Sequence, residues 1–165
     1  MNGLTRTLPT LIDSAVTALL PGPAEQDIAL SFRFKADAGR VFYALSIPEY
    51  IETWLQAPHA GGLHFVFNSV TQESFSLDLY RGESLQAIVH GLCRVVGANQ
   101  VRYVWKITGL SGTTETRVDM KLLCDAAACV LALKHSGFKD ANECVWCREM
   151  WYQSLERLSR LMERN

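Results

Sequence analysis

Histidine, tyrosine and cysteine are the residue types in this chain that could transfer a proton or hold a ligand by a polar contact. His135 shares strand parity with Leu131 and Leu133, so its ring is expected to face the interior. A buried imidazole beside a cavity could act as an acid, a base or a ligand-fixing group. Alternatively, the ring hydrogen-bonds to the loop after Gly137 and shapes it. Both roles stay open, and we favour the structural one.

The other histidines carry less information. His90 lies on a long predicted strand whose two faces are equally apolar, and a bulge would reverse its parity, so the sequence does not decide which face is inside. His59 and His64 flank Gly61, where we expect the mouth of a cavity. No Asp, Glu or Cys completes a recognisable metal-ligand spacing around them. We therefore predict no metal and no cofactor.

Cys144-Val145-Trp146-Cys147 has the C-x-x-C spacing of dithiol redox sites. Both cysteines fall on the apolar stripe of a predicted helix, and no βαβ unit precedes them, so we expect small core residues instead. The five cysteines follow an N-terminal stretch that lacks the features of a secretory signal. We predict reduced thiols and a cytoplasmic location.

Apolar and polar residues alternate from Val101 to Ile107, which predicts a strand with Tyr103 and Trp105 on its inner face. Large aromatic residues there form either the wall of a hydrophobic pocket, with polar handles, or a filled core. No residues form a recognisable catalytic constellation, so catalytic residues stay unknown. The candidate ligand-binding residues are Trp54, Phe65, Phe67, His90, Tyr103, Trp105, His135, Phe138 and Trp146.

Seven strands and two short helices must position these side chains. Asp37 is a predicted N-cap before the first short helix, and Pro48 begins the second. Turn residues join successive strands, which predicts an antiparallel meander whose outer face pairs charges such as Arg102 and Asp119 across strands. The predicted strands are Ile28–Phe34, Leu63–Asn68, Phe75–Tyr80, Leu85–Val96, Val101–Thr108, Thr114–Leu123 and Ala128–His135.

A helical pattern runs from about Lys139 to the end of the chain. Its apolar face must cover one side of the sheet, because both surfaces would otherwise meet water. The predicted fold is therefore α+β: a helix-grip fold in which a curved antiparallel β-sheet of about seven strands wraps a long C-terminal helix and leaves a hollow beside it. That apolar face comprises Cys144, Cys147, Trp151, Leu155, Leu158 and Met162.

The N-terminal segment Pro9–Leu20 has helical periodicity, and Pro21-Gly22-Pro23 ends it. We expect an extra helix that covers the sheet or contacts a second copy, which would make a homodimer. The chain then divides into residues 1–23, an N-terminal helix and linker, and residues 24–165, a single helix-grip domain.

Charge and hydropathy exclude several partner classes. The chain has 165 residues, 48% apolar and 20% charged, with a net charge of −1. Its basic residues are scattered, so we expect no nucleic-acid partner and no attraction to an anionic membrane surface. No apolar run reaches the roughly 20 residues that a spanning helix needs.

Several segments resemble a known superfamily. Val41 to Leu45 followed by Pro48-Glu49, the His90-Gly91 hairpin, and Trp151 to Leu158 resemble the START-like (Bet v 1-like, SRPBCC) superfamily. The similarity spans about Asp27 to Met162 and is greatest to the group of the activator of Hsp90 ATPase homologue and the polyketide cyclases. It implies a helix-grip fold with a cavity. It names no activity, because the superfamily contains carriers, cyclases, hydrolase-like members and a co-chaperone domain.

Three functional hypotheses follow. The leading one is a cytoplasmic binding protein whose partner is a small apolar molecule held in an internal cavity. The second is a cyclase- or dehydratase-like enzyme that uses the same cavity, with His135, His90 or Tyr103 moving a proton. The third is a co-chaperone-like interaction module that docks through its N-terminal helix.

Overall fold

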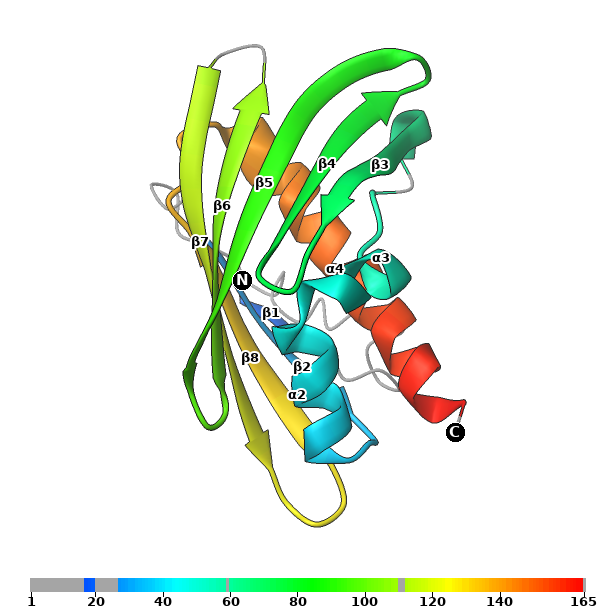
Figure 1. The fold of residues 1–165 in the computed structure, drawn as a ribbon, viewed down its shortest axis with the longest axis vertical. Coiled ribbons are helices and arrows are strands. Elements are labelled where there is room, and N and C mark those ends of the chain that lie inside the picture. Colours follow the sequence, from blue (N-terminus) through cyan, green and yellow to red (C-terminus); the bar gives the residue numbers. More distant parts are fainter. Residues whose placement is uncertain (1–16, 20–26, 59, 110–111, 165) are drawn as a thin grey trace, which may run out of the picture.

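One curved antiparallel sheet wraps a long C-terminal helix (Figure 1). The computed structural model describes residues 17–19, 27–58, 60–109 and 112–164. Their strands form an eight-stranded sheet in the order β1-β2-β8-β7-β6-β5-β4-β3. The strands are β1 (Thr17–Leu19), β2 (Ile28–Phe34), β3 (Leu63–Val70), β4 (Ser74–Arg81), β5 (Ser84–Gly97), β6 (Gln100–Gly109), β7 (Gly112–Cys124) and β8 (Cys129–Ser136).

The helices are α2 (Ala38–Ser46), α3 (Ile51–Trp54) and α4 (Ala141–Glu163), with 3₁₀ segments at Pro48–Tyr50 and Ala60–Gly62. The predicted caps are confirmed, because the Asp37 carboxylate accepts a hydrogen bond from the Arg40 amide at 3.1 Å and Pro48 begins its 3₁₀ turn. Helix α4 begins after Asp140, whose carboxylate accepts from the Asn142 amide at 2.7 Å. The helix-grip fold is confirmed.

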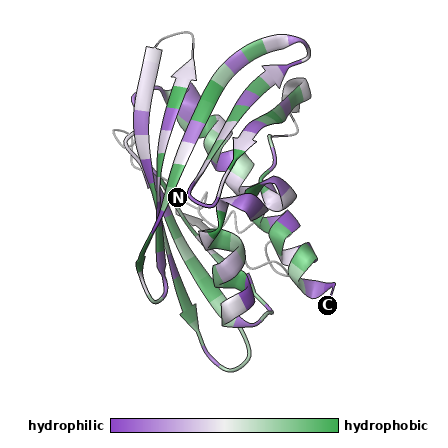
Figure 2. Cartoon of the chain, in the orientation of Figure 1, coloured by the Kyte–Doolittle hydropathy of each residue, from purple (hydrophilic) through white to green (hydrophobic). Residues whose placement is uncertain are grey.

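Alternation along the strands produces the two faces of the sheet, and Figure 2 shows it as alternating hydrophobic and hydrophilic bands. On β6, Val101, Tyr103, Trp105 and Ile107 are buried while Lys106 is exposed. The inner faces of the strands, the apolar side of α4 and the short helices enclose one continuous core.

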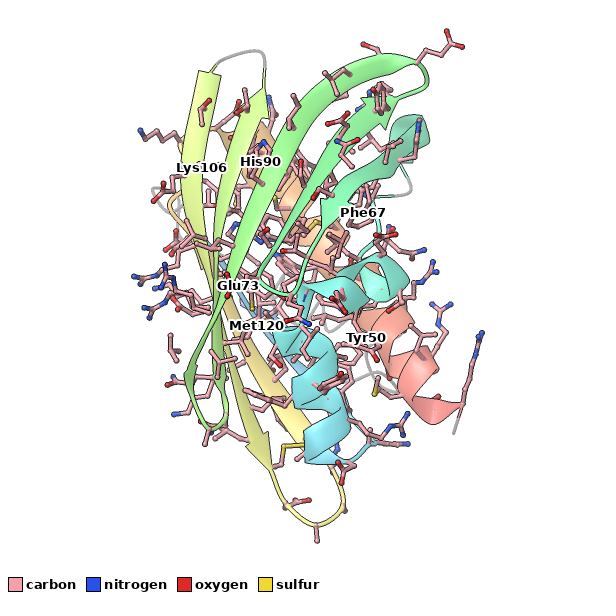
Figure 3. All side chains as sticks on the ribbon, in the orientation of Figure 1. Tyr50, Phe67, Glu73, His90, Lys106 and Met120 are labelled. Carbon is pink, nitrogen blue, oxygen red and sulfur yellow. A yellow bond between two sulfur atoms is a disulfide. The ribbon has the colours of Figure 1, made fainter. Side chains whose placement is uncertain are left out.

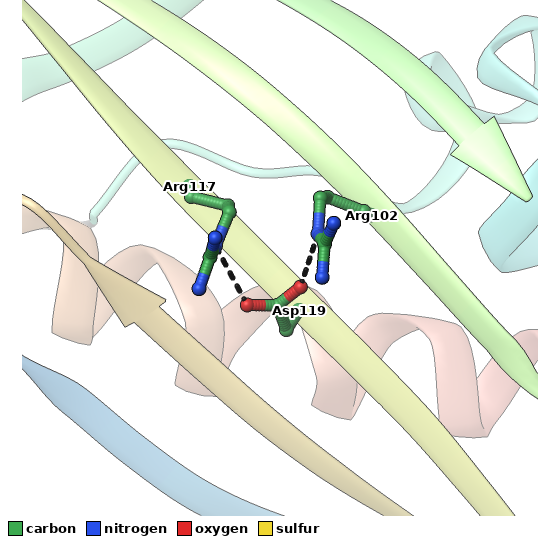
Figure 4. A network of polar contacts seen from close by, with 3 residues as sticks. All are labelled: Arg102, Arg117 and Asp119. Atoms are coloured by element: carbon green, nitrogen blue, oxygen red, sulfur yellow. Dashed lines mark hydrogen bonds and ion pairs between the residues drawn. The ribbon is translucent and has the colours of Figure 1, made fainter. Parts of the chain in front are cut away.

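The outer face of the sheet carries charges, as predicted. Arg102 and Asp119 are register partners on β6 and β7, and the Arg102 Nε atom lies 2.7 Å from Asp119 Oδ1. The Arg117 Nε atom lies 3.0 Å from Asp119 Oδ2, so one carboxylate bridges two guanidinium groups (Figure 4). These side chains are 32–56% exposed, so each pair contributes only about 0–1 kcal/mol.

The N-terminal prediction requires a correction. Thr17–Leu19, the end of the predicted helix, is strand β1 and pairs antiparallel with β2. Pairing with β1 satisfies the backbone hydrogen-bonding groups on the edge of β2. The periodicity of the N-terminal segment alone does not show that this edge needs a partner strand. The remainder of the predicted Pro9–Leu20 helix lies outside the described residues.

The cysteine prediction is wrong for one pair. Cys124 and Cys129 form a disulfide at the end of the β7–β8 hairpin, with their Cα atoms 4.1 Å apart. They are register partners because Asp125 closes the turn, its carboxylate accepting from the Ala127 and Ala128 amides at 2.8 and 2.9 Å. Cys93, Cys144 and Cys147 are free and buried.

Candidate functional site

His90 lies on the outer face of β5, which settles the face that the sequence left open. Ala87, Val89, Gly91 and Cys93 are the inward residues of this strand. His90 pairs in register with Lys106, and Figure 3 shows both labels on neighbouring strands. Together with residues of β4 they line a shallow outer groove of about 530 Å³. His90 is thus separated from the space between the sheet and α4.

His135 is fully buried and held in a chain of hydrogen bonds. The Trp151 indole Nε1 donates to His135 Nδ1 at 3.0 Å, and His135 Nε2 lies 2.8 Å from the Thr116 hydroxyl. The hydroxyl donates in turn to the Trp105 carbonyl at 3.4 Å. Since Nδ1 accepts, the neutral ring carries its proton on Nε2 and donates it to Thr116.

Burial lowers the pKa of His135 from its ordinary 6.5 to about 3. The neutral imidazole therefore joins α4 to strands β7 and β8 at neutral pH. His135 has a structural role, as we favoured, but its hydrogen-bond partners are Thr116 and Trp151 and not the loop after Gly137. Both ring nitrogens already have partners, which leaves neither for a ligand.

The polar groups of two more aromatic side chains form hydrogen bonds within the protein. The Tyr103 hydroxyl donates to the Leu45 carbonyl at 2.8 Å, and the Trp54 indole donates to the Ala44 carbonyl at 3.1 Å. Burial, with the neighbouring Cys93 thiol, raises the pKa of Tyr103 well above its usual value. These bonds anchor the C-terminal end of α2 to the core.

The predicted aromatic residues pack largely against one another. The ring centroids of Trp105 and Trp151 are 5.3 Å apart, those of Trp54 and Trp151 are 6.4 Å apart, and those of His135 and Phe138 are 4.4 Å apart. Such spacings are those of contacting aromatic pairs. Trp105 Nε1 is buried and has no hydrogen-bond partner among the described residues. The centre of the molecule is an aromatic cluster.

Phe65, Phe67 and Trp146 lie nearer the surface. Phe65 and Phe67 are half-buried on the inner side of β3, with centroids 6.4 Å apart. Trp146 is half-buried on α4 and forms part of a groove where the first turns of the helix face the ends of β3, β4 and β5. Of the nine predicted ligand-binding residues, Trp146 lines this groove. Phe65 and Phe67 do not line it, but they lie on β3, the strand that contributes Leu63 to the groove.

This groove, the α4 groove, has a volume of about 610 Å³. Leu79 and Ala87, both buried, supply apolar walls on the sheet side, and Leu63 extends them. Arg81 marks the sheet-side rim, where its Nη1 donates to the Gly61 carbonyl at 2.9 Å. Apolar walls combined with a few polar groups are typical of small-molecule sites.

Glu143, in the first turn of α4, supplies a buried carboxylate to the groove. The residue is 7% exposed, and its Oε1 has no hydrogen-bond partner among the described residues. Burial and the neighbouring charge of Asp140 raise the pKa of Glu143, while a hydrogen bond from the Thr114 hydroxyl lowers it. The groove therefore contains a buried acceptor whose position is set by the helix.

Glu143 was missed by the sequence analysis, although a signal for it exists. It lies four residues before Cys147, seven before Met150 and eleven before Ser154, all buried on one side of α4. This spacing places an ionisable residue on the apolar stripe. A carboxylate on an apolar stripe is unusual enough to mark a site, because its burial without partners is costly.

Comparison with known proteins identifies the fold. No protein-family model matches the sequence, and no curated protein matches it. Protein CV1439 from Chromobacterium violaceum is similar in structure, with a TM-score of 0.70, 21% identity, and coverage of 85% of this chain and 99% of that one. The AHSA1 protein from Silicibacter pomeroyi is similar with a TM-score of 0.64 and 19% identity, over 83% of this chain and 97% of that one. CalU16 from Micromonospora echinospora is similar with a TM-score of 0.54 and 17% identity, over 92% of this chain and 85% of that one.

The chain shares the helix-grip fold of these proteins, which is the fold that the START-like resemblance of its sequence implies. At identities of 21% or lower, the similarity establishes the fold and carries no activity. Within the described residues, no helix is long and apolar enough to cross a membrane.

Proposed function

We propose that this protein binds a small, largely apolar molecule in the α4 groove. The observation that carries the proposal is the groove itself, whose volume of about 610 Å³ is within the size range of small-molecule sites. Leu63, Leu79, Ala87 and Trp146 offer apolar surface, so burial of the ligand would stabilise the complex at about 25 cal/mol per Å².

Trp146 is the proposed anchor of the site. Its half-buried indole lies on α4 opposite the strands, where a ligand could pack between the ring and the sheet. Aromatic side chains of this kind contribute most to binding because they bury a large area with few rotatable bonds. Phe65 and Phe67 extend the apolar inner side of β3 next to Leu63, and we propose them as secondary contacts.

A proton-transfer enzyme receives less support than a binding protein. The candidate proton carriers His135 and Tyr103 are both buried and hydrogen-bonded to protein atoms, and neither lines the α4 groove. His90 lies on the outer face. An interaction module would need a docking surface. The segment expected to supply it forms strand β1 in its described part, Thr17–Leu19, and its remainder lies outside the described residues.

Displacement of a fluorescent probe tests the proposal. Delipidated protein is titrated with the neutral apolar dye N-phenyl-1-naphthylamine, and Trp146→Ala is compared with Leu92→Ala, a variant of the outer groove. We expect saturable binding that Trp146→Ala weakens by about tenfold, the effect of losing roughly 1.4 kcal/mol, and that Leu92→Ala leaves unchanged. Absence of binding, or sensitivity to Leu92→Ala alone, would refute the α4 groove as the site.

A further inference from the structure

Glu143 lines the α4 groove with a side chain that is buried and only partly hydrogen-bonded. The residue is more than nine-tenths buried, and its Oε1 has no donor among the described residues. Its Oε2 faces Gly109, where a Cβ atom would lie 3.6 Å from that oxygen, so the carboxylate sits close against the end of β6. A ligand with an N–H or O–H donor would supply the partner that Oε1 lacks.

The charges around the groove decide which donor fits. Asp140, Glu143 and Glu149 lie on the helix side, and Arg81 is the cation that the sheet side contributes to the same lining. The Arg81 guanidinium is turned to the Gly61 carbonyl at the rim. Burial raises the pKa of Glu143, and an ammonium group beside its carboxylate would favour the ionised form. A cationic ligand would be attracted to this side of the groove, and an anionic one repelled.

We propose that the natural ligand is an amphipathic amine, whose ammonium group donates to Glu143 and whose apolar part lies against Leu63 and Trp146. This inference rests on the binding function proposed above and specifies the chemical class of the ligand. An ammonium group has three donors and no acceptor, which matches a site that offers carboxylate oxygens. Hydrogen bonds between ionised partners are stronger than neutral ones, so Glu143 selects the amine over a neutral hydroxyl.

Three matched eight-carbon probes test this proposal. Octylamine, 1-octanol and octanoate each compete with N-phenyl-1-naphthylamine for wild-type protein and for Glu143→Gln, which keeps the size of the side chain. Glu156→Gln is the control, since Glu156 lies on the same helix but does not line the groove. We expect octylamine to bind about tenfold more tightly than 1-octanol, and octanoate to bind most weakly.

Glu143→Gln should remove most of the preference for octylamine while leaving the affinity for 1-octanol unchanged, and Glu156→Gln should keep the preference. Equal affinity for octylamine and 1-octanol in the wild type, or a preference that survives Glu143→Gln, would overturn the inference. Glu149→Gln, at an exposed position of the lining, provides a second test should Glu143→Gln fail to fold. It should reduce the preference about twofold, and an unchanged preference would count against a cationic ligand.

The outcomes separate the two proposals. Binding of the dye and of 1-octanol without preference for octylamine would overturn only the amine inference. Failure of the dye and of every probe to bind the wild type would instead overturn the binding function on which it rests.

Discussion

At the residue scale, the His135 chain shows how one polar side chain connects two layers of the fold. Its imidazole accepts from Trp151 on α4 and donates to Thr116 on β7, with no part of the ring exposed. Removing the ring would leave a buried indole N–H and a buried hydroxyl without these bonds, and each such group costs about 1–3 kcal/mol.

Acidification should destabilise the protein through His135. Its pKa is 6.5 when unfolded and about 3 in the fold, so between these values the unfolded chain binds a proton that the native ring does not. The free energy of unfolding therefore falls as the pH drops below about 6.5, by about 1 kcal/mol per pH unit from this group. Urea denaturation at several pH values measures this slope.

The contribution of His135 is isolated by difference. His135→Gln should be less stable at neutral pH, and its stability should depend less on pH between 6.5 and 4. His90→Gln, at an exposed position, should keep the wild-type stability at neutral pH. An unchanged slope in His135→Gln would mean that the ring does not titrate as its burial requires.

Sequence parity placed His135 inside correctly but could not name its partners. Thr116 and Trp151 lie 19 and 16 residues away, on separate elements, and their approach depends on how α4 crosses the sheet. Glu143 is the opposite example, since its spacing from Cys147 and Ser154 already placed it on the apolar stripe. Its unpartnered oxygen, however, can be seen only when the facing strands are in place.

At the element scale, Gly91 allows β5 to pass beneath an aromatic ring. Gly91 and Phe75 are register partners on β5 and β4, and a Cβ atom at Gly91 would overlap the Phe75 ring. Gly91→Ala should therefore destabilise the protein by about 1–3 kcal/mol through overpacking. Urea denaturation measures the loss.

Gly97→Ala is the matched control on the same strand. Its added Cβ would meet the Gln100 side chain at an ordinary 3.6 Å, so we expect a change of only about 0.5 kcal/mol or less. Equal stability of Gly91→Ala and the wild type would show that Phe75 does not lie over the glycine.

The Cys124–Cys129 disulfide of the β7–β8 hairpin can be tested by counting the free thiols of the protein. Denatured, unreduced protein should expose three alkylatable thiols, from Cys93, Cys144 and Cys147, and reduction should expose all five. Mass spectrometry after alkylation gives the numbers. Five thiols before reduction would show that Cys124 and Cys129 are unpaired.

Strand and helix positions were largely predictable, and pairings that depend on turns and edges were not. The alternation around Trp105 and the caps at Asp37 and Pro48 specified their elements locally. The Cys124–Cys129 pair depends on the turn that Asp125 closes, and β1 depends on the open edge of β2. Neither the disulfide nor the β1–β2 pairing can be predicted from the periodicity of a single segment.

At the scale of the whole molecule, the grip of the sheet on α4 creates both the core and the groove. The middle of α4 packs Trp151 against the aromatic cluster, while its first turns stand off the ends of β3–β5 and leave the α4 groove. The fold class could be inferred from the order of elements. The groove could not, because its walls are brought together from segments far apart in the sequence, including Leu63, Ala87 and Trp146.

The most direct test of the α4 groove as a binding site is a ¹H–¹⁵N NMR titration of the uniformly labelled protein with octylamine. We predict that the largest saturable shifts fall on the Trp146 indole N–H and on the amides of Leu63, Leu79 and Glu143. Shifts confined to the outer face, around His90 and Lys106, or no saturable shifts at all, would contradict it.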